Sequence, residues 1–132
     1  MLDRLPPALD PRRRMARQPY FAFHLAMLLL LLLLFILLYI LGTLLPGLVD
    51  TLEESWLYEI VAGAIGLLLT LLGLTVVARR CHDIGWTGWA ALLILIPFLG
   101  TAFWLALFVI PGTRGQNAYG PDPRFEGAPP PD

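Results

Sequence analysis

The stretch from Phe21 to Leu45 constrains the fold more than any other part of the chain, because it contains no charged residue. Residues 28–34 are an unbroken run of leucine. A helix of this length, at about 1.5 Å per residue, is longer than the roughly 30 Å hydrocarbon core of a bilayer. A secretory signal peptide would have a shorter apolar region followed by small residues at a cleavage site, and residues 44–48 offer no such site. The stretch therefore predicts a retained transmembrane helix.

Two further apolar segments follow, at about residues 57–78 and 89–110. Hydrophobic residues make up 58% of the 132 residues and charged residues only 14%, whereas soluble domains average roughly 45–50% and about 25%. A soluble fold of this length could not bury so much apolar surface. We therefore expect an all-α integral membrane protein with three transmembrane helical segments. Residues 21–110 form its membrane domain, which is surrounded by the lipid bilayer.

The third apolar segment contains Pro97 and Gly100 at its centre. Proline removes a backbone hydrogen bond and kinks a helix, and neighbouring helices must then satisfy the freed carbonyl. We expect a single span that is kinked at Pro97. The alternative is a re-entrant hairpin, in which each arm is too short to cross the bilayer and both ends return to one surface.

Charged residues on the two sides of the first span predict its orientation. The N-terminal arm, residues 1–20, is interrupted by prolines and carries five arginines, whereas the loop at residues 46–56 carries acidic residues and no basic one. An excess of arginine marks the cytoplasmic side, so we expect the arm and the loop at residues 79–88 in the cytoplasm. The arginines could also contact anionic lipid headgroups. The net charge of −1 gives no reason to expect a nucleic-acid partner.

Small residues recur along one face of the second span. Ala62, Gly66, Thr70 and Gly73 stand at positions i, i+4, i+8 and i+11. Small residues at this spacing allow another helix to approach closely, which is how helices associate in lipid. This small-residue face predicts packing against another span, a second copy of the chain or a membrane-protein partner.

A polar loop separates the second and third apolar segments. If the second helix continues for one more turn, either Arg79 or Arg80 can pair with Asp83 on its surface, which lowers the cost of a carboxylate at the membrane edge. Glycines then allow the chain to turn, and tryptophans suit the membrane interface. The candidate residues of this loop are Arg79, Arg80, His82, Asp83, Gly85, Gly88 and Trp89.

Catalysis and metal binding are not expected in the polar loop. Cys81, His82 and Asp83 are adjacent in sequence, and adjacent side chains on a helix diverge by about 100°, so the three cannot converge on one ion. A structural zinc ion normally needs four protein ligands. We therefore assign no catalytic, metal-binding or cofactor-binding residue. An anion or a lipid phosphate held by Arg79 and Arg80 is the alternative use of this loop.

Residues 111–132 form a tail rich in glycine and proline, which predicts turns and disorder rather than a packed core. We expect residues 127–132 in particular to be disordered. The candidate residues of the tail are Pro111, Gly112, Thr113, Gly115, Asn117, Tyr119, Gly120, Asp122 and Pro123.

The loop sequence R-R-C-H-D-I-G-W-T-G-W and the tail sequence P-G-T-x-G-x-N-x-Y-G-x-D-P together resemble those of bacterial inner-membrane proteins grouped as domain of unknown function 805. A weaker match is Arg14-x-x-Arg17-x-x-Tyr20-Phe21, which is similar to the basic and then aromatic start of that family's first span. The resemblance implies a multi-pass protein of the bacterial inner membrane. The family has no assigned activity, so the resemblance supports architecture and localisation rather than a function.

Three functions fit these observations. The leading hypothesis is a non-catalytic membrane protein that acts by helix association, with itself or with a membrane partner. The alternatives are a small transporter or channel assembled from several copies, and a lipid-binding, anion-binding or lipid-modifying protein that uses residues 79–83. The topology of the third segment distinguishes them in part: three crossings would put the tail outside, whereas a re-entrant segment would return it to the cytoplasm beside the polar loop.

Overall fold

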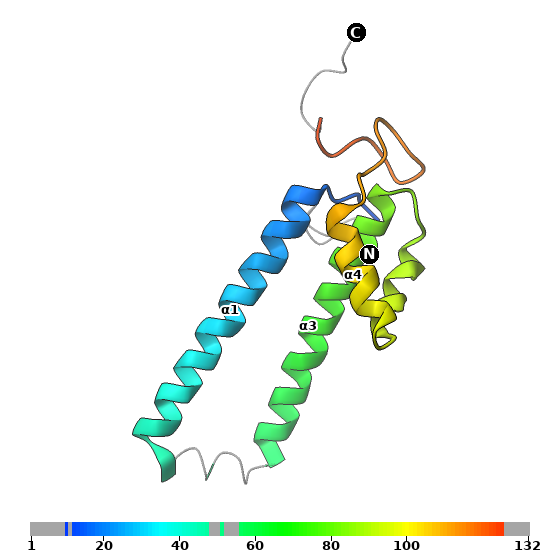
Figure 1. The fold of residues 1–132 in the computed structure, drawn as a ribbon. Coiled ribbons are helices and arrows are strands. Elements are labelled where there is room, and N and C mark those ends of the chain that lie inside the picture. The colour runs from blue at the N-terminus through cyan, green and yellow to red at the C-terminus, as the bar shows by residue number, and fades with distance from the viewer. Residues whose placement is uncertain (1–9, 11, 48–50, 52–55, 126–132) are drawn as a thin grey trace. The chain divides into compact units, whose positions relative to one another are not determined.

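The computed structural model describes residues 10, 12–47, 51 and 56–125. Within them the chain forms α1 (Arg17–Leu44), α3 (Trp56–Asp83), the 3₁₀ helix η2 (Gly88–Leu95) and α4 (Leu99–Val109), with no extended strand in the described part (Figure 1). The expected all-α class is confirmed for these residues. By their contacts, residues 22–71 make one compact unit, and residues 1–21 with 72–132 make another.

Helices α1 and α3 are each 28 residues long and apolar enough to cross a membrane. At about 1.5 Å per residue, either helix is longer than the roughly 30 Å hydrocarbon core. The leucine run of α1 is exposed along its whole length, with Leu33 at 64%. Such a surface is stable in lipid, whereas in water it would cost free energy in proportion to its apolar area. The spans expected at residues 21–45 and 57–78 are therefore present as helices.

Helix α3 continues past its apolar segment and ends at Asp83, so the first residues of the polar loop form its last turn. The chain turns away from the helix at Gly85, whose φ of 85° is a conformation that glycine adopts without steric cost. The amide of Trp86 donates to the carbonyl of Cys81 at 2.8 Å, and that of Gly85 donates to the carbonyl of His82 at 3.1 Å. These two bonds make a Schellman motif, which satisfies carbonyls at the end of the helix.

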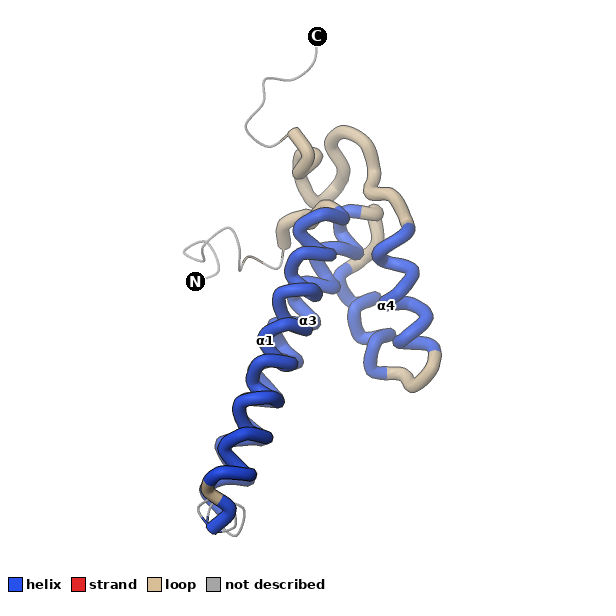
Figure 2. The backbone as a smooth tube through the Cα atoms, turned by 60° about the vertical axis from the view of Figure 1, so that its left-hand side comes forward, coloured by secondary structure: helices blue, strands red, loops and turns tan. Residues whose placement is uncertain are grey.

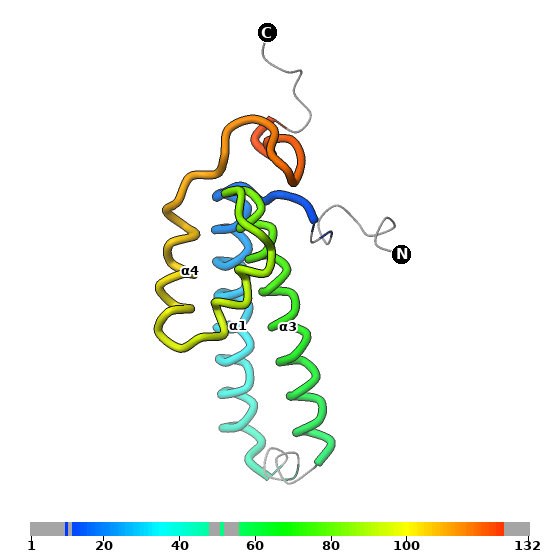
Figure 3. The backbone as a smooth tube through the Cα atoms, turned by 90° about the vertical axis from the view of Figure 1, so that its right-hand side faces the viewer, coloured from blue at the N-terminus to red at the C-terminus, as the bar shows by residue number. Residues whose placement is uncertain are grey.

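The third apolar segment is a hairpin of two short helices. Helices η2 and α4 are separated by a turn at residues 96–98, visible in yellow in Figure 3. Phe98 at the tip has a φ of 61° and is 91% exposed. Gly100 lies directly against the backbone of Ile94, where any side chain would collide. Pro97 and Gly100 therefore belong to a turn that reverses the direction of the chain. The missing Cβ of Gly100 lets η2 and α4 approach each other.

Both ends of the hairpin lie at the C-terminal end of α3. Gly88, at its start, is close to His82, and the carbonyl of Ile110, at its end, accepts a hydrogen bond from Arg80. The preferred expectation of one span kinked at Pro97 is therefore not confirmed, and neither is the count of three spans. Among the described residues, two helices have the length and composition to cross a bilayer.

After α4, residues 110–125 form a loop (tan in Figure 2) that contains no helix. Gly115 and Gly120 have φ values of 73° and 120°, and the amides and carbonyls of Asn117 and Gly120 form a small antiparallel bridge. The turns expected from the tail sequence are thus present, but the expectation of a disordered tail is wrong for residues 111–125, because hydrogen bonds hold them in a defined loop. The disorder expected at residues 127–132 and the acidic loop residues 50, 53 and 54 lie outside the described residues.

Candidate functional site

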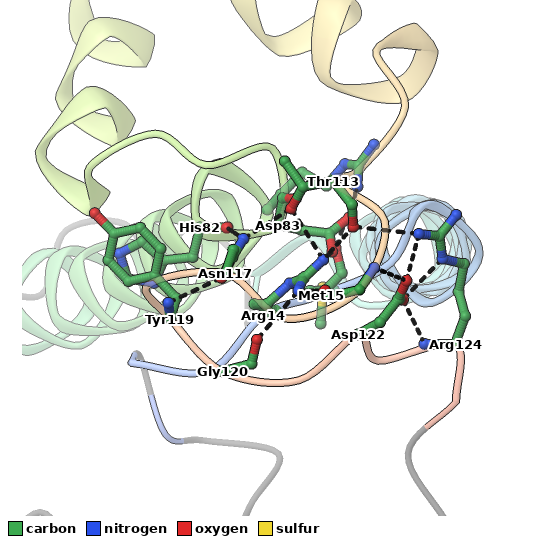
Figure 4. Close-up of polar contacts among 12 residues, drawn as sticks. Arg14, Met15, His82, Asp83, Thr113, Asn117, Tyr119, Gly120, Asp122 and Arg124 are labelled. Atoms are coloured by element: carbon green, nitrogen blue, oxygen red, sulfur yellow. Dashed lines mark hydrogen bonds and ion pairs between the residues drawn. The ribbon is translucent and has the colours of Figure 1, made fainter. Parts of the chain in front are cut away.

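Three segments distant in sequence meet at the end of α3, and Figure 4 shows their contacts. The N-terminal arm contributes Arg14, the last turn of α3 contributes Arg80 and Asp83, and the tail contributes Thr113 and its neighbours. We call Arg14, Arg80 and Asp83 the arginine–aspartate cluster. The structure thus brings together the two motifs, loop and tail, that the sequence singled out.

The carboxylate of Asp83 accepts hydrogen bonds from two buried arginines. Arg14 donates to its Oδ1 from Nε at 3.2 Å and from Nη2 at 3.1 Å, and Arg80 donates to its Oδ2. The three side chains are only 1%, 0% and 4% exposed for Arg14, Arg80 and Asp83. Of the two pairings with Asp83 that the sequence allows, the structure contains that of Arg80. Charged groups at this depth are stable only when paired and hydrogen-bonded, and here both conditions hold.

The guanidinium of Arg80 also binds the end of α4. Its Nε donates to the carbonyl of Leu107 at 3.0 Å and its Nη2 to that of Ile110, while Nη1 reaches the carbonyl of Met15 at 3.4 Å. The last carbonyls of a helix have no partner inside the helix. Arg80 supplies that partner and thereby fixes the hairpin to α3.

The guanidinium of Arg14 binds the tail. Its Nη2 donates to the carbonyl of Thr113 at 2.6 Å, and its Nη1 donates to the carbonyls of Gly115 at 2.6 Å and Gly120 at 3.2 Å. Five N–H donors in a fixed plane allow one arginine to hold several acceptors at once. Arg14 therefore connects the arm, the carboxylate of Asp83 and the loop of the tail.

The tail motif is held against α3 by contacts specific to its residue types. The amide and the hydroxyl of Thr113 donate to the carbonyl of Asp83 at 2.8 and 2.9 Å. The side-chain amide of Asn117 donates to the carbonyl of His82 at 2.9 Å, and the ring of Tyr119 stacks on that of His82 with 4.0 Å between centroids. Gly112 lies so close to the Asp83 carboxylate that any Cβ would overlap it.

A second ion pair closes the tail loop. Asp122 accepts hydrogen bonds from Nε of Arg124 at 2.8 Å and from the amide of Gly115 at 3.1 Å. The hydrogen bonds from the Arg124 side chain hold the pKa of the Asp122 carboxyl well below its ordinary value. Asp122 is therefore ionised across the physiological range and holds the loop in its turn.

The remaining candidates lie around the cluster or apart from it. Arg79 is buried, and its carbonyl accepts from the amide of Met15 at 3.0 Å. Trp89 is exposed, as is Pro111, while Pro123 is half-buried. On the small-residue face, Ala62, Gly66 and Thr70 are exposed and Gly73 is half-buried.

The chemistry of the cluster is that of a structural connection. Asp83 accepts from two arginines, and all three guanidinium nitrogens of Arg80 donate to protein acceptors. Among the described residues, no group of three His, Cys, Asp or Glu side chains could hold a metal ion. Arg14 is the residue that sequence reasoning missed, because its charge was interpreted as setting orientation. Its place in the Arg-x-x-Arg-x-x-Tyr-Phe pattern was the available signal.

The sequence matches the family described as "Protein of unknown function (DUF805)" over residues 8–121. It is 43% identical over 75 residues to the inner membrane protein YhaH of Escherichia coli (strain K12), a match that covers 49% of this chain and 60% of the relative. It is 45% identical over 60 residues to the inner membrane protein YhaI of the same strain, covering 45% of this chain and 51% of the relative. The chain thus spans between half and two thirds of the length of these relatives. No solved structure matches.

Proposed function

The chain belongs to the DUF805 family of proteins of unknown function, and we propose that it is a non-catalytic inner-membrane protein that acts by association of its spans. The partner is a second copy of the chain or another membrane protein. The small-residue face of α3 carries this proposal.

The small-residue face has room for another helix. A Cβ built at Gly66 or at Gly73 meets no atom within 4 Å among the described residues outside its own turn of helix. The hydroxyl of Thr70 donates to the carbonyl of Gly66 at 2.8 Å, so the face carries no polar group that lipid would leave unsatisfied. In lipid, helices associate through close backbone contact, and this face allows it.

The arginine–aspartate cluster supports a scaffolding role for the rest of the chain. Its charges neutralise each other in part, and Arg80 donates to Asp83 and to the carbonyls of Leu107 and Ile110, which argues against Arg80 as half of an anion site with Arg79. The same engagement of Asp83 argues against a lipid-modifying reaction at His82 and Asp83. A transporter would need polar groups at mid-depth of a span, and α1 has no charged residue between Phe21 and its end.

For the topology, we propose two crossings and a re-entrant hairpin. Eight arginines among the described residues lie in the arm, at the end of α3 and in the tail, and the positive-inside rule assigns such a surface to the cytoplasm. The arm, the polar loop and the tail then share the cytoplasmic side. Helices η2 and α4, with 8 and 11 residues, are too short to cross.

The experiment places a photoreactive residue at Leu69, beside the small-residue face, and measures crosslinked products in native membranes. The double variant Gly66→Leu with Gly73→Leu should lose the crosslinked band, because two large side chains prevent close approach of the partner backbone. Ala64→Leu, a small-to-large change on the opposite side of α3, is the control and should keep it. A band of twice the monomer mass indicates a second copy, and another mass indicates another protein. Equal crosslinking in all variants, or none in the wild type, would overturn the proposal.

A further inference from the structure

A second feature of the fold, separate from the small-residue face, is an amphipathic pocket at the beginning of α1. The pocket has a volume of about 380 Å³ and is lined by Arg17, Gln18, Phe21 and Phe108. We call it the Arg17 pocket. Its polar lining comes from the first turn of α1, and its apolar lining comes from Phe21 and from Phe108 on α4.

The aromatic wall of the pocket is held in place by other rings. Phe108 contacts Tyr20 with 4.8 Å between centroids, Trp104 at 4.9 Å and Phe21 at 6.2 Å, the last two edge to face. Edge-to-face pairs at these distances are favourable arrangements of aromatic rings. The wall is therefore a preformed apolar surface.

Arg17 differs from the arginines of the cluster in its surroundings. Arg14 and Arg80 are buried and directed at protein acceptors, whereas Arg17 is exposed. Its Nη1 donates to the carbonyl of Val109 at 3.3 Å, which positions the guanidinium over the end of α4. A guanidinium has five N–H donors. Among the described residues, the Arg17 side chain donates to the carbonyl of Val109. Its other N–H groups are therefore left for a ligand.

The position of the pocket along the chain indicates what kind of anion it meets. Arg17 immediately precedes the uncharged stretch that begins at Phe21. In a membrane helix this position lies at the level of the headgroups, where arginine and aromatic side chains concentrate. A ligand here is therefore exposed to water at one end and to hydrocarbon at the other.

From this geometry we propose that the Arg17 pocket binds one anionic phospholipid. Arg17 and the Gln18 amide bind the headgroup phosphate, and Phe21 and Phe108 contact the glycerol and the first carbons of an acyl chain. Arginine suits this role because its planar fork binds phosphate oxygens in pairs. A free phosphate would satisfy Arg17 but would leave the aromatic wall uncovered, so the pocket selects a lipid. The volume falls within the range of small-molecule sites.

The test uses the full chain, purified in detergent, and native mass spectrometry to count retained lipids after exchange with phosphatidylglycerol or with phosphatidylcholine. The wild type should retain one phosphatidylglycerol in preference to phosphatidylcholine. Arg17→Gln should lower that retention roughly tenfold or more, the effect of removing a charged hydrogen-bond donor. Phe108→Leu should lower it less, because an apolar wall remains. Circular dichroism confirms that each variant keeps its helices.

The control is Arg13→Gln, which removes an exposed arginine of the same arm that does not line the Arg17 pocket. It should leave retention unchanged. If Arg13→Gln and Arg17→Gln weaken retention equally, the binding is a general attraction of the basic arm and the proposal is wrong. If glycerol 3-phosphate displaces the lipid at equal concentration, the site recognises phosphate alone, and the acyl contacts are likewise refuted.

Discussion

The sharpest prediction concerns Asp83→Asn, which removes one charge from the arginine–aspartate cluster and keeps the shape of the side chain. Asp83 accepts from three N–H groups of Arg14 and Arg80, all of them buried. The amide retains one acceptor oxygen but turns an NH₂ group towards a guanidinium. The buried guanidinium groups of Arg14 and Arg80 would then have only uncharged hydrogen-bond acceptors.

The free-energy cost of Asp83→Asn follows from the burial of the three charged side chains. Breaking a buried ion pair by removing one partner costs about 3–5 kcal/mol, because the remaining charge stays in a poorly solvated position. At about 1.4 kcal/mol for each factor of ten, the population of molecules in which the end of α3 is open should rise roughly one hundred- to a few thousandfold. The loss should be local, because α1 and the apolar part of α3 do not contribute to the cluster.

Cys81 provides the assay. It is the only cysteine of the chain, it is 0% exposed, and it lies two residues before Asp83 on α3. A maleimide can therefore react with it only when this end of the helix opens, and in the limit of fast reclosing the labelling rate reports the open population. The rate in detergent, divided by the rate in the denatured chain, should rise for Asp83→Asn by the factor above.

The control is Asp10→Asn, which removes a carboxylate that pairs with Arg12 at 3.1 Å on the surface of the arm. Exposed ion pairs contribute little to stability, so this variant should label at nearly the wild-type rate. Labelling of Asp83→Asn at the wild-type rate would refute the reasoning, since it would mean that the carboxylate does not hold the segments together.

Two further predictions concern the tail and the hairpin. Gly112→Ala should accelerate labelling of Cys81 in the same assay, because the added methyl group overlaps the Asp83 carboxylate, whereas Gly63→Ala meets no described atom within 4 Å and should not; equal rates would contradict the described contact. In a Cys81→Ala background, single cysteines at Thr87 and Gln116 should both react with an impermeant maleimide only after cells are permeabilised. Reaction of the cysteine at Gln116 in intact cells would mean that the third segment crosses the membrane.

The long helices could be predicted from the sequence because their cause is local. An uncharged run such as residues 21–45 has no stable arrangement in water, so its environment and helical state follow from composition alone. The Arg80–Asp83 pair was predictable for the same reason, since positions i and i+3 are neighbours on any helix. The extra turn of α3 beyond its apolar segment was considered for the same reason, and the helix does continue to Asp83.

The hairpin and the cluster depend on distant contacts, which a single sequence does not reveal. Pro97 and Gly100 are compatible with a kink or a reversal, and the choice depends on Arg80 holding the end of α4. Arg12, Arg13 and Arg17 of the same arm are exposed, and charge alone does not distinguish the buried Arg14 from them. The family resemblance joined the two motifs in sequence but gave no contact between them.

The sequence separations within the cluster set an order of events during synthesis. Arg14 lies 69 residues before Asp83 and 101 residues before Gly115, whose carbonyl it binds. Its last partner, the carbonyl of Gly120, lies 106 residues after it. At about 5–20 residues per second, the arm is complete roughly 5–20 s before that partner exists. Both long helices are therefore made before the cluster can close, and membrane insertion precedes the assembly of the surface that joins the two ends of the chain. A chain that stops before Thr113 can insert its helices but cannot complete that assembly.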